Sequence, residues 1–96
     1  MVNYSLSEKA DADIEDIYEY GLLTFGLSQA QTYLLELHER FQMLSENPNY
    51  GRSASHLAER LKRFEYQSHV IFYVPQDSGI LIVRVLRQER DFIKYF

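Results

Sequence analysis

The spacing of apolar residues changes from a strand-like to a helical period near the start of the chain. Val2, Tyr4 and Leu6 alternate with polar residues, which predicts a short strand with one buried face. From Ser7 to Phe25 the apolar residues recur every three or four positions, which predicts an amphipathic helix with Ser7 as its N-cap. Acidic residues in the first turns favour the positive end of the helix dipole.

A second helical pattern follows after a short turn. A capping box from Ser28 to Gln31 predicts where this helix begins, and Asn47-Pro48 predicts where it ends. Because the turn is so short, the two helices must pack antiparallel. The next segment, residues 48–59, contains Asn, Pro and Gly and predicts an irregular loop, with Leu57 as a possible anchor.

Three short runs rich in β-branched and aromatic residues occupy the rest of the chain. They span about residues 61–66, 69–74 and 80–87 and predict an antiparallel meander. The expected fold is α+β, in the order β-α-α-β-β-β, with a helical hairpin packed on a small, mostly antiparallel sheet. At 96 residues the chain has room for one domain, residues 1–96.

Turn lengths predict a register in which Tyr66 faces His69 and Val74 faces Ile80. One face is then mostly apolar and suits the helices: Lys62, Phe64, Tyr66, His69, Ile71, Tyr73, Leu81, Val83, Val85 and Arg87. The other face is both apolar and charged: Leu61, Arg63, Glu65, Val70, Phe72, Val74, Ile80, Ile82, Arg84 and Leu86. Such a face suits a partner chain better than bare solvent.

Charge divides the chain into two unlike halves. Residues 1–50 carry two basic and nine acidic residues, whereas residues 51–96 carry eight basic and five acidic ones. This asymmetry suggests a partner for one half, although a solvated acidic helix beside a mixed sheet explains it equally well. The chain has no cysteine, no apolar run that could span a bilayer and no signal-peptide pattern at its start, so we expect it in the cytoplasm.

Candidate catalytic chemistry is sparse. A nuclease needs a base, an acid and cations, and the candidates are His69, Tyr73, Tyr95, Lys94, Arg63, Arg84 and Arg87. A histidine among apolar strand residues is more often structural, and we interpret Asp13 and Asp16 as a solvated helix start rather than paired catalytic carboxylates. The histidines show no metal-ligand spacing and the glycines form no phosphate loop, so we predict neither a metal nor a cofactor.

The last ten residues, 87–96, mix basic with aromatic side chains. Such residues bind proteins and nucleic acids well. We expect Phe92 and Ile93 to pack on the domain, and leave open whether Lys94, Tyr95 and Phe96 do so.

Several motifs in order resemble the ParE branch of the RelE/ParE toxin superfamily. They are Tyr4-Ser5-Leu6-Ser7 leading to Ala10, the Asp-Ile-x-x-Ile-Tyr pattern at 13–18, Phe25-Gly26, Ala30-x-x-Tyr33, Pro48 to Gly51-Arg52, the strand 69–73 and the segment 84–91. The resemblance implies a toxin of a type II toxin-antitoxin module that acts on DNA gyrase. It also implies a ParD-like antitoxin whose carboxyl-terminal segment wraps the toxin. One departure is Arg87, where many ParE chains have histidine.

The predicted function is therefore a non-enzymatic toxin that binds gyrase and traps cleaved DNA. Two alternatives remain: a RelE-like, ribosome-dependent messenger RNA endonuclease, and a degenerate toxin that only binds antitoxin. The residues predicted to contact the antitoxin, an acidic amphipathic segment, are Tyr18, Leu22, Phe25, Tyr33, Leu37, Arg63 and Arg84. Those predicted to contact the target are Arg87, Arg90, Lys94, Tyr95 and Phe96.

Overall fold

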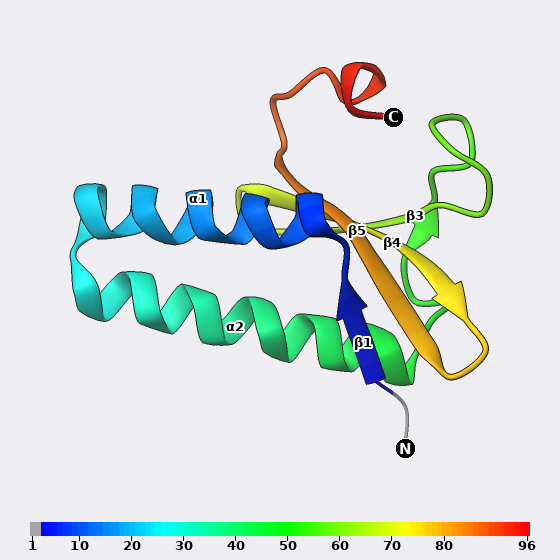
Figure 1. The fold of residues 1–96 in the computed structure, drawn as a ribbon, viewed down its shortest axis with the longest axis horizontal. Helices are drawn as coiled ribbons and strands as arrows, with labels where there is room; N and C mark the ends of the chain where they lie inside the picture. The colour runs from blue at the N-terminus through cyan, green and yellow to red at the C-terminus, as the bar shows by residue number, and fades with distance from the viewer. Residues whose placement is uncertain (1–2) are drawn as a thin grey trace.

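Two long helices and a five-stranded sheet make up the computed structural model, which describes residues 3–96 (Figure 1). The elements are β1 (Asn3–Leu6), α1 (Glu8–Phe25), α2 (Leu27–Glu46), β2 (Arg52–Ser53), β3 (Lys62–Tyr66), β4 (His69–Gln76), β5 (Gly79–Arg87) and the short 3-10 helix η1 (Phe92–Tyr95). The strand order is β1-β5-β4-β3-β2, with β1 parallel to β5 and the other pairs antiparallel. The α+β prediction is confirmed; β2 and η1 were not expected, and Val2 lies outside the described residues.

The helical hairpin turns on a single residue. Ser7 caps α1 as predicted, since its side chain accepts a hydrogen bond from the Ala10 amide at 3.0 Å. Gly26, with φ of 93°, ends α1 and directly precedes α2. The predicted capping box at Ser28 is therefore wrong: Ser28 lies inside α2, which has no side-chain N-cap. One glycine reverses the chain because it alone tolerates this backbone conformation.

The register differs from the prediction in the second hairpin of the meander. Tyr66 faces His69 as expected, but Val74 faces Leu81 because Pro75 and Gln76 remain in β4 and leave a two-residue turn. An irregularity then shifts the pairing between Phe72 and Tyr73. The different pairing at the turn places Ile80 and Ile82 in the core on the helix side and Val83 on the other side, opposite to the predicted faces. The extra residue then restores the predicted alternation, so Val85 packs on the helix side and Leu86 on the other side, as expected.

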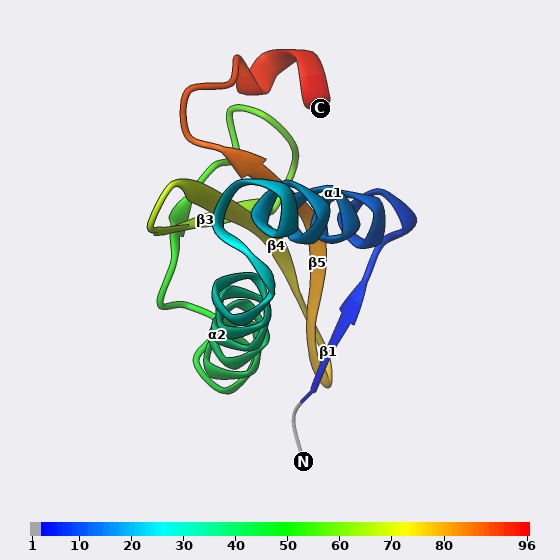
Figure 2. The ribbon, with the colours of Figure 1, turned by 90° about the vertical axis from the view of Figure 1, so that its left-hand side faces the viewer.

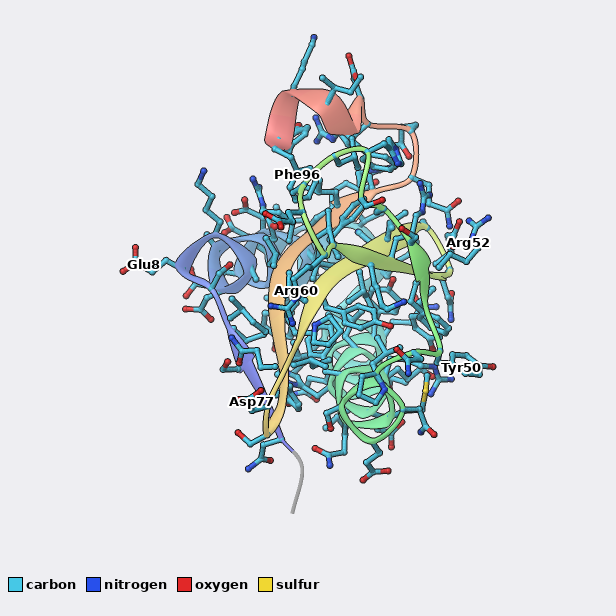
Figure 3. All side chains as sticks on the ribbon, turned by 90° about the vertical axis from the view of Figure 1, so that its right-hand side faces the viewer. Glu8, Tyr50, Arg52, Arg60, Asp77 and Phe96 are labelled. Atoms are coloured by element: carbon cyan, nitrogen blue, oxygen red, sulfur yellow. The ribbon has the colours of Figure 1, made fainter. Side chains whose placement is uncertain are left out.

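Each face of the sheet has its own hydrophobic core. The core on the helix side contains the fully buried Leu37, Phe41, Leu44, Ile71 and Tyr73. The second core is centred on Leu61, Val70, Phe72 and Leu86, and Leu57, Phe92 and Tyr95 pack against it. The loop before β3 and the carboxyl-terminal tail therefore cover the second face, on the opposite side of the sheet from α2 (Figures 2 and 3).

This covering corrects the prediction of an open face for a partner chain. The chain's own loop and tail cover the apolar residues of that face, as the hydrophobic effect favours. No helix in residues 3–96 combines the length and apolar character needed to cross a bilayer.

Candidate binding groove

A groove with a volume of about 620 Å³ runs between the helical hairpin and the end of the sheet. Its helix wall is largely aromatic and includes Tyr18, Tyr20, Phe25 and Tyr33. Its opposite wall comes from the β3–β4 turn, from β5 and from the tail, and includes His69, Arg84, Arg87, Arg90 and Tyr95. The helix wall also carries Asp13 and Asp16, so the groove joins a mainly aromatic wall with two carboxylates to a basic one.

A tyrosine-histidine pair joins the two walls of the groove. The Tyr33 hydroxyl and His69 Nδ1 form a hydrogen bond of 2.7 Å, and the Tyr33 ring stacks on Tyr66 with centroids 5.9 Å apart. Burial is the main cause that raises the pKa of Tyr33 to about 12. Burial, with the positive charge of Arg87, lowers the pKa of His69. Both rings are therefore neutral near pH 7, and they connect α2 to β4 without adding charge.

The carboxylate of Asp13 holds α1 against β5. It accepts hydrogen bonds from Arg84 Nε at 2.8 Å, from Arg84 Nη2 at 2.7 Å and from the Val85 amide at 3.0 Å. The Arg84 and Asp13 side chains are only 14% and 12% exposed, and the Arg84 guanidinium lies 5.1 Å from the Tyr95 ring centroid. The hydrogen bond to Asp13 raises the pKa of Arg84.

The interpretation of Asp13 as part of a solvated helix start was therefore wrong. Strand β1 ends beside Ile82, so the next stretch of β5 has no strand neighbour on that side. Asp13 meets this stretch as α1 crosses it, and satisfies the Val85 amide. Sequence reasoning could say that Arg84 needs an acidic partner, but no local signal identifies one 71 positions away.

The basic rim of the groove consists of Arg87 and Arg90. Arg87 Nε donates to Glu89 at 2.6 Å, and its guanidinium lies 5.6 Å from the Tyr20 ring centroid. Arg90 is exposed, and no ion pair to it is found within residues 3–96. The rim therefore retains positive charge for an anionic partner.

The residues predicted to contact the antitoxin divide into three groups. Tyr18, Phe25, Tyr33 and Arg84 line the groove. Leu22 lies outside its lining, on the exposed tip of the hairpin. The remaining two residues, Leu37 and Arg63, do not belong to this surface.

Leu37 requires correction, and Arg63 lies away from the groove. Leu37 is fully buried in the core on the helix side, because helical periodicity marks an apolar stripe without showing which part of it the sheet covers. Arg63 lies on the other face, with its guanidinium 5.2 Å from the Phe92 ring centroid and paired with Glu65 at 3.2 Å. Neither side chain can serve the groove.

The residues predicted to contact the target also separate. Arg87, Arg90 and Tyr95 line the groove. Phe96 instead packs on Phe72, with ring centroids 4.9 Å apart. Phe92 packs as expected, at 5.0 Å from the same ring, whereas Ile93 is 73% exposed, so the expectation that it packs was wrong.

Four of the seven candidate nuclease groups line the groove, and the other three do not. His69, Arg84, Arg87 and Tyr95 line the groove, but Arg84 is already neutralised by Asp13. Tyr73 is fully buried, with its hydroxyl donating to the Pro48 carbonyl and accepting from the Gly51 amide, both at 2.9 Å. Lys94 and Arg63 are not part of the groove lining. In the described part of the chain no three His, Cys, Asp or Glu residues cluster as metal ligands.

Comparison with known proteins decides the family. A family model described as "ParE toxin of type II toxin-antitoxin system, parDE" matches residues 4–92. The chain belongs to the ParE toxin family. Toxin ParE1 of Caulobacter vibrioides is 36% identical over 91 residues, which are 95% of this chain and 94% of the relative. Toxin ParE1 of Mycobacterium tuberculosis is 34% identical over 89 residues, or 92% and 91% of the two chains.

Solved structures confirm the fold of this ParE toxin. A chain described as the chromosomal ParDE TA system from P. aeruginosa superposes with a TM-score of 0.77 at 21% identity, covering 93% of this chain and 98% of that one. The resemblance inferred from the sequence motifs is thereby confirmed over nearly the whole chain. The protein is a ParE-type toxin of a ParDE type II toxin-antitoxin system.

Proposed function

We propose that this ParE toxin inhibits DNA gyrase by binding, in the cytoplasm, and that a ParD-like antitoxin neutralises it by placing an acidic amphipathic segment in the groove. The observation that carries the antitoxin proposal is the pairing of an aromatic wall with a basic rim in one groove of about 620 Å³. Gyrase as the target follows from family membership.

The chemistry of the two walls supports this occupant. Aromatic side chains such as Phe25 and Tyr33 supply buried anchor contacts, which carry most of the binding energy at interfaces. Arg87 and Arg90 on the rim attract acidic side chains and speed the encounter. An amphipathic segment presents apolar and acidic residues at once, so it suits both walls.

Inhibition by binding is favoured over catalysis because the polar groups of the site are already engaged. Tyr33 and His69 are hydrogen-bonded to each other and neutral, and Arg84 is held by Asp13. A general base or acid would need to reach a substrate proton, whereas these groups bind one another.

The antitoxin proposal is tested by truncating an anchor. Phe25→Ala removes a 61% exposed ring that lines the groove, and should weaken antitoxin binding by about 1 to 3 kcal/mol. Leu35→Ala is the matched control, because Leu35 is 66% exposed and lies outside the groove. Equal affinity of both variants, measured by calorimetry on folded protein, would place the antitoxin elsewhere.

The same preparation separates the modes of action. Gyrase supercoiling and ribosome-dependent messenger RNA cleavage are measured with wild-type toxin. We expect loss of supercoiling and intact messenger RNA. Cleaved messenger RNA with normal supercoiling would identify a nuclease, and antitoxin binding without either effect would identify a degenerate toxin.

A further inference from the structure

The tip of the helical hairpin forms a second surface, made of Leu22, Leu23 and Leu27, with Phe25 and Tyr20 of the groove at its border. We infer that this tip binds the toxin's cellular target, through an apolar site on that target flanked by lysine or arginine. The inference rests on the proposed toxin function but not on gyrase being the target. It separates the target contact at the tip from the antitoxin contact in the groove.

The tip exposes apolar side chains that a monomer would normally bury. Leu23 is 85% exposed, Phe25 61% and Leu27 57%, all within one short stretch of chain. Figure 1 shows this end of α1 and α2 extending beyond the sheet, so no strand covers it. Contiguous exposed apolar residues of this kind mark interaction sites more often than scattered single ones.

The tip is also rigid. The Gly26 amide donates to the carbonyls of Gly21 and Leu22, each at 3.2 Å, and closes the end of α1. Gly21 lets the helices approach so closely that a Cβ there would lie 3.3 Å from the Ala30 Cβ. A surface fixed in this way loses little conformational entropy when a partner binds.

Charge around the tip defines the chemistry of the partner. No lysine or arginine occurs between Lys9 and Arg40, whereas that stretch contains seven acidic residues. Of these, Glu15 and Glu19 are exposed on α1 outside the groove lining, and Glu19 lies one turn from Leu23, whereas Asp16 lines the groove. A partner with basic groups around its apolar site complements this pattern. A second copy docked tip to tip would instead oppose the two sets of acids.

The groove and the tip need oppositely charged partners. The rim of the groove is basic through Arg87 and Arg90, and Leu22, Leu23 and Leu27 are absent from its lining. An acidic antitoxin segment suits that rim and is repelled by the acids beside the tip. The tip is therefore available to a different partner, which we identify with the cellular target.

The test compares charges introduced at the most exposed tip residue. Leu23→Lys places a positive charge against the basic partner and should reduce growth inhibition on expression at least tenfold. Leu23→Glu also loses the apolar contact, but its carboxylate attracts the basic groups of the partner. It should therefore reduce growth inhibition less than Leu23→Lys does. Leu35→Lys is the control at a similarly exposed leucine of α2, and should match wild type. Antitoxin affinity and the thermal midpoint should be unchanged in all three.

Several outcomes would overturn the inference. They are wild-type toxicity of Leu23→Lys, equal impairment of Leu23→Glu, loss of antitoxin affinity in place of toxicity, and lack of growth inhibition by the wild-type chain. Self-association of the wild type that Leu23→Lys abolishes, detected by sedimentation, would also overturn it by identifying a second copy as the occupant. If growth inhibition depends on Leu23 but wild-type toxin does not affect gyrase supercoiling, the result supports the tip as the target-binding surface. It then rejects gyrase as that target.

Discussion

At the scale of single residues, the Asp13 carboxylate joins parts of the chain that are far apart in sequence. It accepts hydrogen bonds from two nitrogens of the Arg84 guanidinium and from the Val85 amide. The Arg84 guanidinium also lies against the Tyr95 ring of η1. Bidentate arginine-carboxylate pairs are among the stronger polar contacts in proteins. One side chain thus links α1, β5 and the tail.

Replacing Asp13 by alanine should lower the free energy of unfolding by about 2 to 3 kcal/mol, because it leaves a partly buried guanidinium and a backbone amide without partners. Urea unfolding measures the loss. Asp16→Ala, at an exposed position one turn further along α1, should change stability by no more than about 0.5 kcal/mol. A loss no larger in Asp13→Ala than in the control would show that the pair contributes little.

At the scale of elements, the joining of β1 to β5 depends on a glycine. Gly79 faces Asn3 across the parallel pair, with φ of 151°. A Cβ added there would lie 1.8 Å from the Asn3 carbonyl oxygen. The sequence places Gly79 at the end of a loop, but in the structure it begins β5 and lets β1 approach.

Gly79→Ala should therefore push β1 away from β5 and cost about 3 kcal/mol, from backbone strain and overpacking together. Hydrogen exchange adds a local measurement, since the amides of Tyr4 to Leu6 should exchange faster than those of β3 and β4. Ser78→Ala, in the exposed turn next to it, is the control and should exchange like wild type. Unchanged protection of β1 in Gly79→Ala would mean that the strand pair adapts to the new side chain.

At the scale of the whole molecule, the sheet is covered on both faces, and the tail is part of the second core. The rings of Phe92 and Phe96 contact Phe72 with centroids 5.0 and 4.9 Å apart. The sequence predicted Tyr95 and Phe96 as target contacts and left open whether they pack on the domain. Because the contacts with Phe72 are structural, deletion of residues 94–96 would disturb stability and activity together.

Neighbouring residues of η1 provide a cleaner experiment. Phe92→Ala should lower the free energy of unfolding by about 2 to 3 kcal/mol, somewhat less than for a fully buried ring. Ile93→Ala should change it by no more than about 0.5 kcal/mol, since Ile93 is 73% exposed. Equal thermal midpoints for the two variants would contradict a packed tail.

The sequence by itself determined features that depend on neighbouring residues. The end of the first helix at Phe25 and of the second before Asn47, the N-cap at Ser7 and the pairing of Tyr66 with His69 follow from local periodicity and turn chemistry, and the structure confirms them. The family also follows from motifs in their order along the chain, and the family match confirms it. Such patterns can be detected in the sequence because each involves residues only a few positions apart.

The tertiary structure alone decided which surfaces are free. The two-residue turn after Gln76 exchanged the faces of Ile80, Ile82 and Val83, since side chains alternate with a period of two. The tail closed the face that had been assigned to a partner, and Asp13 reached Arg84 across 71 positions. Contacts of this kind form between distant segments, so no local pattern encodes them. The groove and the hairpin tip are the surfaces that stay exposed after those contacts have formed.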